Sequence, residues 1–488
     1  MPSKLLPALL LATLAFTGCT PAPPQAHFAT VQQTVAQRTG ATIHWRTGSP
    51  EDATADHAVH ALLNQPLTAE AVAQIALLNN RHLQAMFEEI GIAQADLVQA
   101  GLLKNPVFDL GVRFPNRSPS KTYLDLSIAS DFIELFLIPA RQKLAGATLR
   151  QADLRVADQV LETVARAKSD FYRYQAAGQM LELRRQVASA TSASADAAGR
   201  LFEAGNIAEL DRLAEQTQDA RAQIELASAQ AESAETRETV NKVMGLTAMI
   251  DSWKPIPRLL DPPPADVDSS ELESVAIRQR QDLAAAREDF ALQSQSLTFT
   301  RQTRFLSAAT LGAEAERETD GQWRIGPALS VPIPLFDQGQ GAIARQQAIL
   351  RQSRARYDAL SADVRSEVRS GTLRLQNARA KAALYRDQVL PLQHRLVEQT
   401  QLHFNGMFVG VFQLLEARRA EISAGSEYIA ALRDYWTARA ELERATGGGA
   451  LPQGSPAATQ SATTHPSTPD SQPMPADPHE HHHHGANP

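Results

Sequence analysis

The chain repeats one order of predicted elements, with the copies about two hundred residues apart, and this repeat restricts its fold more than any other feature. Each copy predicts an amphipathic helix, two alternating strands, a long helix, a glycine turn and a returning helix. SVAIRQRQDLAAAREDF matches QIALLNNRHLQAMFEEI, with Ala276 at the place of Ala76. HFNGMFVGVFQLL matches RLFEAGNIAELDRL, so the turns at Gly205 and Gly406 correspond.

Short stretches of alternating apolar and polar residues predict the strands. PVFDLGVRFP and TYLDLSIAS flank the polar turn NRSPSK and predict a β-hairpin over about 106–130. FLSAATLGAEAE and QWRIGPALSVPI predict a second β-hairpin over about 304–334. The strand length suits a bilayer, but four strands are too few to close a barrel. After the N-terminal signal no run of eighteen apolar residues occurs, so any crossing of a membrane requires a closed barrel.

The segments between the hairpins predict helices far longer than a globular domain needs. A helix from Leu67 to Gly101 precedes the first hairpin, and helical periodicity then continues from about 140 to 203. About sixty residues at 1.5 Å each span on the order of 95 Å. A second long helix is predicted from about Gln340, and Pro391 within it predicts a bend. An aromatic content of only 6% agrees with long helices rather than compact cores.

The N-terminal residues predict export and a membrane anchor. Lys4 and the apolar residues that follow predict a secretory signal peptide over 1–18. FTGC resembles the bacterial lipobox, in which Cys19 is acylated; the alternative is a stray cysteine within a cleaved signal. With Cys19 acylated, no thiol remains for a disulfide or a catalytic nucleophile. Residues 19–65, rich in Pro, Thr, Gly and His, predict a lipidated, extended linker.

The C-terminal residues 448–488 are rich in Pro, Ser and Thr, which predicts a disordered tail. Histidines near its end are the strongest metal-binding composition in the chain. A native, weak metal-binding tail is favoured over an expression tag, because Glu480 interrupts the cluster and GANP follows it. The histidines are His479, His481, His482, His483 and His484.

Several function classes have no support in the sequence. No phosphate loop, nucleophile elbow or HExxH motif occurs, so the chain is predicted not to be an enzyme and to need no cofactor. The net charge is −7 with both signs interspersed, so no basic stripe predicts a nucleic-acid partner.

Polar side chains shortly after the glycine turns are candidates for a pore. Asp211 and the pair Gln413 and Glu416 are predicted about two helical turns past the tips. If identical chains surround an axis, rings of such side chains would attract cations and set the barrier of a channel. The alternative is that they are exposed helix residues without a role.

These features together resemble the TolC-like outer-membrane efflux channels, from about Leu67 to Gly447. The resemblance rests on the duplicated plan, the NP before the first strand, SVPIPLFDQGQGAIAR, AELDRL and FQLLEARR. IPLFDQGQG and YWTARAELERATGG are most similar to the branch that serves heavy-metal resistance-nodulation-division pumps, of the cobalt-zinc-cadmium and copper-silver type.

The resemblance implies a mainly α protomer that adds four strands to a membrane β-barrel. Its two structural repeats would cover 66–250 and 269–447, joined by a Pro-rich linker over 251–268. Three protomers would close one twelve-stranded barrel, continuous with a periplasmic α-helical barrel. Opening would follow from untwisting of the helix pairs near the tips.

The resemblance also assigns roles to the tips. Gly205 and Gly406 would be the turns that meet a periplasmic adaptor protein. Asp211, Gln413 and Glu416 would form the pore gate, in which Gln413 replaces one of the family's acids.

The implied function is a passive exit duct in the outer membrane of a Gram-negative bacterium, lipid-anchored and with a large periplasmic portion. An inner-membrane proton-driven pump of the resistance-nodulation-division class and the adaptor would deliver its substrates, heavy-metal cations. Two alternatives stay open: a multidrug or secretion-system exit duct, and a periplasmic metal-binding coiled-coil lipoprotein that spans nothing.

Overall fold

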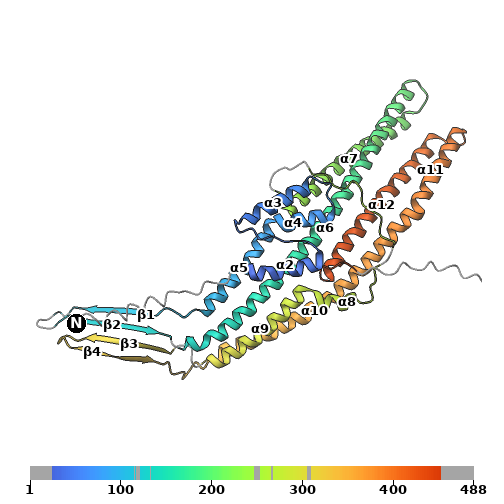
Figure 1. Cartoon of the computed structure of the whole chain (residues 1–488). Helices are drawn as coiled ribbons and strands as arrows, with labels where there is room; N and C mark the ends of the chain where they lie inside the picture. Colours follow the sequence, from blue (N-terminus) through green and yellow to red (C-terminus); the bar gives the residue numbers. More distant parts are fainter. Residues whose placement is uncertain are drawn as a thin grey trace, which may run out of the picture.

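The computed structural model describes residues 25–451 except 115, 117–120, 132, 247–252, 265–266 and 305–308. This part is an elongated protomer with a small β-sheet at one end and two helical hairpins at the other (Figure 1). The predicted signal peptide 1–18, Cys19 with its predicted acylation, and the histidines of the tail lie outside the described residues.

The predicted order of elements occurs twice. The first copy consists of α4 (Ala69–Asn79), α5 (Arg81–Gly101), β1 (Val107–Arg113), β2 (Tyr123–Ser130), α6 (Glu134–Glu203) and α7 (Glu209–Met244). The second copy consists of α8 (Leu272–Gln279), α9 (Gln281–Thr303), β3 (Thr310–Arg317), β4 (Trp323–Ser330), α10 (Gln340–Leu384), a π-helical turn η1 (Tyr385–Val389), α11 (Leu390–Asn405) and α12 (Val411–Ala445).

The helix predicted from Leu67 to Gly101 is two helices, because the backbone at Asn80 is extended instead of helical. The Asn80 side chain caps α5 by accepting a hydrogen bond from the Leu83 amide at 3.1 Å. Its amide group donates to the Val243 carbonyl at 2.8 Å, near the end of α7. Arg280 has the same extended backbone between α8 and α9, so the second copy repeats the break.

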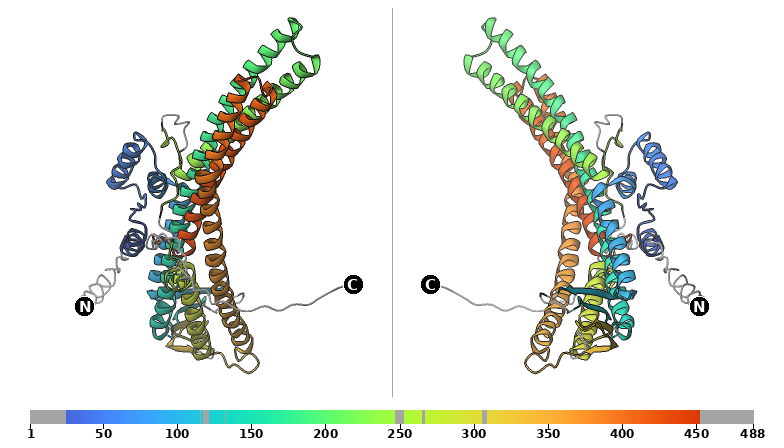
Figure 2. Two further views of the ribbon diagram at one scale, coloured as in Figure 1. Left: turned by 90° about the vertical axis from the view of Figure 1, so that its right-hand side faces the viewer. Right: turned by 90° about the vertical axis from the view of Figure 1, so that its left-hand side faces the viewer.

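The N-terminal segment corrects the expectation of an extended linker over 19–65. It forms two helices, α2 (Gln25–Thr39) and α3 (Pro50–Leu63). The ring of Phe28 packs between Trp45 and Phe87, and all three are buried in the main core. Proline content misled the prediction, because Pro50 starts α3, where a missing N–H is tolerated. In Figure 2 these N-terminal helices lie on one side of the long helices.

Prolines do not end either long helix. Helix α6 contains 70 residues, about 105 Å at 1.5 Å each, and begins before Pro139 rather than near residue 140. At Pro391, where a bend was predicted, the helix contains the π-helical turn η1 directly before α11. A π-helical turn changes the hydrogen-bond ladder locally, so the missing N–H of Pro391 is accommodated without ending the helix.

The sheet is antiparallel throughout, in the order β1-β2-β3-β4. Strands β1 and β4 are therefore edge strands in the protomer, each with one unpaired side. The main hydrophobic core lies elsewhere, around α2, α4, α5 and the middle of α6, and a second core joins α8, α10 and α12. Across the described ranges, every helix is either too short or too polar to cross a membrane.

Candidate functional site

The sheet has one apolar and one polar face. Residues directly opposite each other in a ladder share a face, so the register assigns every side chain. Phe108, Ile128, Ala313 and Pro327 form one row across the four strands, and the other rows of this face are also apolar except at Ser130 and Arg317. Nothing in the described residues covers this face: Phe108 is 63% exposed and Ile325 is 78% exposed.

The opposite face carries four carboxylates and two guanidinium groups. Its central rows pair Asp109 with Ser127 and Glu314, and Asp125 with Glu316. The remaining charged residues of this face are Arg113 and Arg324. A sheet that is apolar on one side and acidic on the other suits a boundary between lipid and water.

The first tip joins α6 to α7 through a left-handed glycine. Gly205 has φ +73°, and the amides of Gly205 and Asn206 donate to the carbonyls of Phe202 and Leu201 at 2.9 and 2.8 Å. This pair of bonds is a Schellman motif, which ends helices where the chain turns left-handed. The tip is therefore formed by the predicted glycine.

The second tip also follows a helix end at the predicted glycine, but its left-handed residue is the next one. Gly406 has φ −83°, and the left-handed residue is Met407 with φ +61°. The same Schellman bonds form here: Met407 and Phe408 donate to Phe404 and His403, each at 2.9 Å. Gly406 lies against the exposed Phe408 ring: a Cβ at Gly406 would lie 2.8 Å from ring atoms, so the ring would have to shift.

The predicted gate residues lie closer to the tips than expected, because the turn residues 204–208 are not helical. Asp211 is the third residue of α7 and Gln413 is the third residue of α12, so they occupy equivalent places. Glu416 follows in the second turn of α12 and lies 3.7 Å from Arg419. Within the described part of one protomer, Asp211 bonds to neither Gln413 nor Glu416.

The structure reveals a link between the hairpins that sequence reasoning missed. Glu215 of α7 is buried, accepts a hydrogen bond from Ser194 of α6 at 2.8 Å, and lies 3.9 Å from Arg419 of α12. Charged residues every three or four positions mark these helices as polar, but a pattern within each helix does not identify partners in different repeats.

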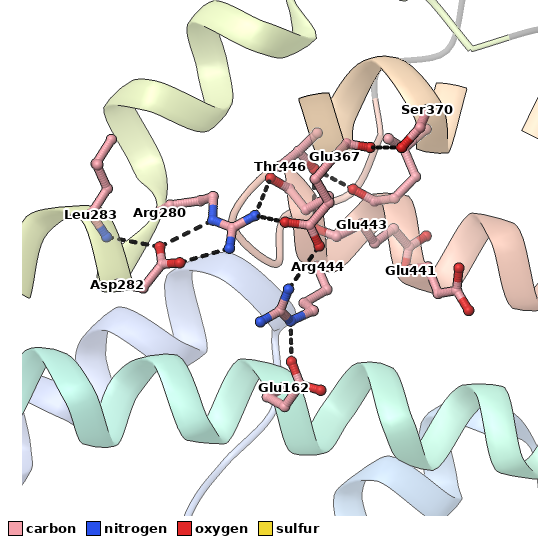
Figure 3. Close-up of polar contacts among 12 residues, drawn as sticks. Glu162, Arg280, Asp282, Leu283, Glu367, Ser370, Glu441, Glu443, Arg444 and Thr446 are labelled. Atoms are coloured by element: carbon pink, nitrogen blue, oxygen red, sulfur yellow. Dashed lines mark hydrogen bonds and ion pairs between the residues drawn. The ribbon is translucent and has the colours of Figure 1, made fainter. Parts of the chain in front are cut away.

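A polar network ties the repeats together in the middle of the molecule. Arg280 is almost fully buried and donates to Asp282 at 2.6 Å and to Glu367 of α10 at 2.5 Å (Figure 3). Glu367 also accepts from Arg444 of α12 at 2.9 Å, and Arg444 pairs with Glu162 of α6. Four long helices are thus joined at one level.

Asp158 of α6 lies beside this network. Burial raises the pKa of its carboxyl to about 6, and the charge of Asp282 adds to the rise against the opposing charges of Arg444 and Arg280. Asp158 and Asp282 line a cavity of about 440 Å³ between α6, α9 and α10. In the parts of the chain that the structure describes, no group of three or more His, Cys, Asp or Glu residues could hold a metal ion.

Comparisons with known proteins found one curated relative by sequence and several solved structures with a similar fold. No protein-family model matches the sequence. The cobalt-zinc-cadmium resistance protein CzcC of Cupriavidus metallidurans is 23% identical over 393 residues, which are 78% of this chain and 90% of CzcC.

Two solved structures have a similar fold. A membrane protein of Pseudomonas aeruginosa superposes with a TM-score of 0.62 at 17% identity, covering 78% of this chain and 92% of that one. The outer membrane channel CmeC of Campylobacter jejuni gives a TM-score of 0.61 at 14% identity, covering 82% and 87%. The chain therefore has the fold of the TolC-like outer-membrane efflux channels, and in sequence it is similar to a member of their heavy-metal branch.

Proposed function

We propose that three copies of this chain form an outer-membrane exit duct for heavy-metal cations. The observation that carries the proposal is the two-faced sheet with two open edges at the end of the long helices. An exposed apolar face and unpaired edges are unfavourable in water. Edge-to-edge closure of twelve strands in a lipid bilayer removes both problems, because every backbone group is then paired.

The polar face of each sheet would then line the lumen. Its four carboxylates outnumber its two guanidinium groups, so the exit would attract cations rather than anions. CzcC, a cobalt-zinc-cadmium resistance protein, is the relative that favours metal cations over organic drugs. The chain itself would be passive and receive its substrates from an inner-membrane proton-driven pump through a periplasmic adaptor.

The helical end would be periplasmic. The two tips, at Gly205 and at Gly406 with Met407, would contact the adaptor, and Asp211, Gln413 and Glu416 would surround the narrow end of the tube. The repeats 66–250 and 269–447 would each supply one hairpin to this end. Cys19, acylated after removal of residues 1–18, would add a lipid anchor at the outer membrane.

Two measurements test the proposal at separate levels. Purified membranes should contain a trimer that dissociates only on heating, and it should conduct ions in planar bilayers. Extraction into the soluble fraction without detergent would instead favour the non-spanning lipoprotein.

A deletion strain should be more sensitive to Cu, Ag, Zn, Co, Cd or Ni than its parent. Sensitivity to antibiotics alone would support a drug duct, and sensitivity to neither would contradict export.

Met407 offers a test of the tip that separates docking from folding. Its side chain is 93% exposed in a left-handed conformation that glycine adopts more easily. Met407→Gly should therefore keep or slightly raise thermal stability while it weakens adaptor binding and metal resistance. Unchanged adaptor binding would show that this tip is not part of the docking surface.

A further inference from the structure

His394 of α11 contacts a carboxylate with each of its ring nitrogens, and one of these contacts crosses to α12. Nδ1 lies 3.0 Å from a carboxylate oxygen of Glu421 in α12, and Nε2 lies 3.3 Å from Glu398 in α11. Arg418 of α12 holds the other oxygen of Glu421 at 3.0 Å. The imidazole therefore lies between two carboxylates, one on each helix.

This geometry favours a charged imidazole. Nδ1 is hydrogen-bonded to Glu421, and the contact of Nε2 with Glu398 becomes an ion pair when the ring is protonated. Only the protonated ring offers a donor to each carboxylate. A neutral ring would direct a lone pair at one of the carboxylates. Because Glu398 and Glu421 use opposite nitrogens, they cannot share one metal ion with His394, which excludes a chelate here.

The two carboxylates beside His394 outweigh the opposing charge of Arg418. The hydrogen bond with Glu421 raises the pKa of His394 above its ordinary 6.5, Glu398 raises it further, and Arg418 opposes both. The neighbouring η1 turn adds no free charge, because its Arg386 and Asp387 pair with each other at 2.7 Å.

The first hairpin has no such titratable bridge. Asp219 lies as far beyond Gly205 as Glu421 lies beyond Met407, and there Thr191 of α6 donates to Asp219 at 3.3 Å. A second cross-helix contact is the Arg184–Glu225 pair at 2.6 Å. Threonine does not titrate and arginine stays charged near neutral pH, so this hairpin is held equally at pH 5 and pH 8.

We propose that His394 makes the second hairpin, and not the first, responsive to pH, with acid holding α11 against α12 and alkali releasing it. The bridge is fully present below the ordinary pKa of histidine and is lost as the pH rises through the raised value. Its consequence for gating rests on the proposed function, whereas the bridge itself does not.

Hydrogen exchange measured on the full-length protein in detergent tests the bridge directly. Exchange of 390–405 in α11 is compared with 188–203 in α6 within the same sample, after correction for the intrinsic effect of pH. In the wild type, the exchange rate of α11 divided by that of α6 should rise between pH 5.5 and pH 9. The rise should reach at most about fivefold, the range expected for an exposed ion pair.

Variants distinguish the bridge from a general effect of pH. In His394→Asn the ratio of α11 to α6 exchange should be high, as in the wild type at alkaline pH, and should no longer depend on pH. In His394→Arg the same ratio should be low at every pH. Thr191→Val should leave the pH profile of α11 unchanged. A wild-type ratio without pH dependence, or a His394→Asn variant with the wild-type profile, would overturn the proposal.

Conductance in planar bilayers then tests the consequence for the channel. The open fraction should increase with pH in the wild type and stay constant in His394→Arg. If the protein conducts but both forms have the same pH profile, the bridge does not control gating. If it does not conduct at all, the proposed duct fails, while the exchange result remains a separate measurement of the bridge.

Discussion

Glu215 of α7 and Arg419 of α12 lie 3.9 Å apart and connect the two hairpins near their tips. The Glu215 side chain is only 9% exposed, whereas 41% of Arg419 is exposed. Water therefore screens the Glu215 charge little, and Arg419 is the cation that compensates it. Arg419 also lies 3.7 Å from Glu416 on its own helix, so it contacts one carboxylate on each hairpin.

Removing Arg419 should loosen the two hairpins. We expect Arg419→Ala to raise the open fraction in planar bilayers by about fivefold, the upper range for a partly exposed ion pair. Arg354→Ala is the matched control, because Arg354 pairs only with the exposed Asp358 on its own helix. Equal open fractions in the two variants would contradict a role for the link.

Arg280 should contribute more to stability than any exposed arginine. It is buried and bonds to both Asp282 and Glu367, so Arg280→Ala leaves Asp282 without its bonded cation and leaves Glu367 with Arg444 alone. The expected loss is about 3 kcal/mol, measured as the thermal loss of helical circular dichroism. Arg369→Ala, which breaks an exposed pair with Glu273, should change stability by less than about 0.5 kcal/mol.

Asp158 should make stability fall as the pH rises. Its folded pKa of about 6 exceeds the ordinary 3.8, so the folded state holds this proton more tightly than the unfolded state. The charged form of Asp158 then lowers the stability by about 3 kcal/mol, a loss that develops between pH 4 and 6 and is constant above pH 6.

Asp158→Asn removes that loss. Compared with wild type, its gain in stability should be absent at pH 4 and reach about 3 kcal/mol at pH 7.5. Asp363→Asn, at an exposed position of α10, is the control and should follow the wild-type profile. A gain that is equal at both pH values would show that Asp158 does not titrate as the structure indicates.

Alanine substitutions at two left-handed glycines distinguish the cost of backbone strain from the cost of steric overlap. Gly205 and Gly245 have φ +73° and +72°, but only at Gly245 would a Cβ collide, with the Asn79 carbonyl. We expect Gly205→Ala to cost about 1–2 kcal/mol and Gly245→Ala to cost clearly more, with poor yield of folded protein. Similar thermal stabilities of the two variants would disagree with this contrast.

Local patterns were sufficient to predict the strands and the long helices. Alternation in TYLDLSIAS and helical periodicity before Glu203 act within one element, so a single sequence contains the whole signal. The helical N-terminal segment was missed because its stability comes from distant residues: Phe28 packs on Phe87, far along the chain. Amino-acid composition is a poor predictor of secondary structure in a segment that is stabilised by tertiary packing.

The candidate site was predicted less completely than the fold. Aligning Gly205 with Gly406 located both turns, but it carried no information on which residue is left-handed, and at the second tip this is Met407, a residue type that is rare in that conformation. The Glu215–Arg419 and His394–Glu421 contacts depend on how helices rotate against each other. The spacing of residues along one helix does not determine how that helix is rotated against its neighbour, so these contacts could not be predicted.

Arg38 of α2 donates a hydrogen bond at 2.9 Å to the carbonyl oxygen of Gly447, a residue 409 positions away. Such a contact can form only after nearly the whole chain has been synthesised, and contacts of long sequence separation slow folding. The apolar side chains of α2 do not wait for it: Phe28, Val31 and Val35 are buried in the main core, where Phe28 packs on Trp45 and Phe87. Truncation shortly before Gly447 should therefore remove this contact between the two ends of the described chain and leave the packing of α2 in place.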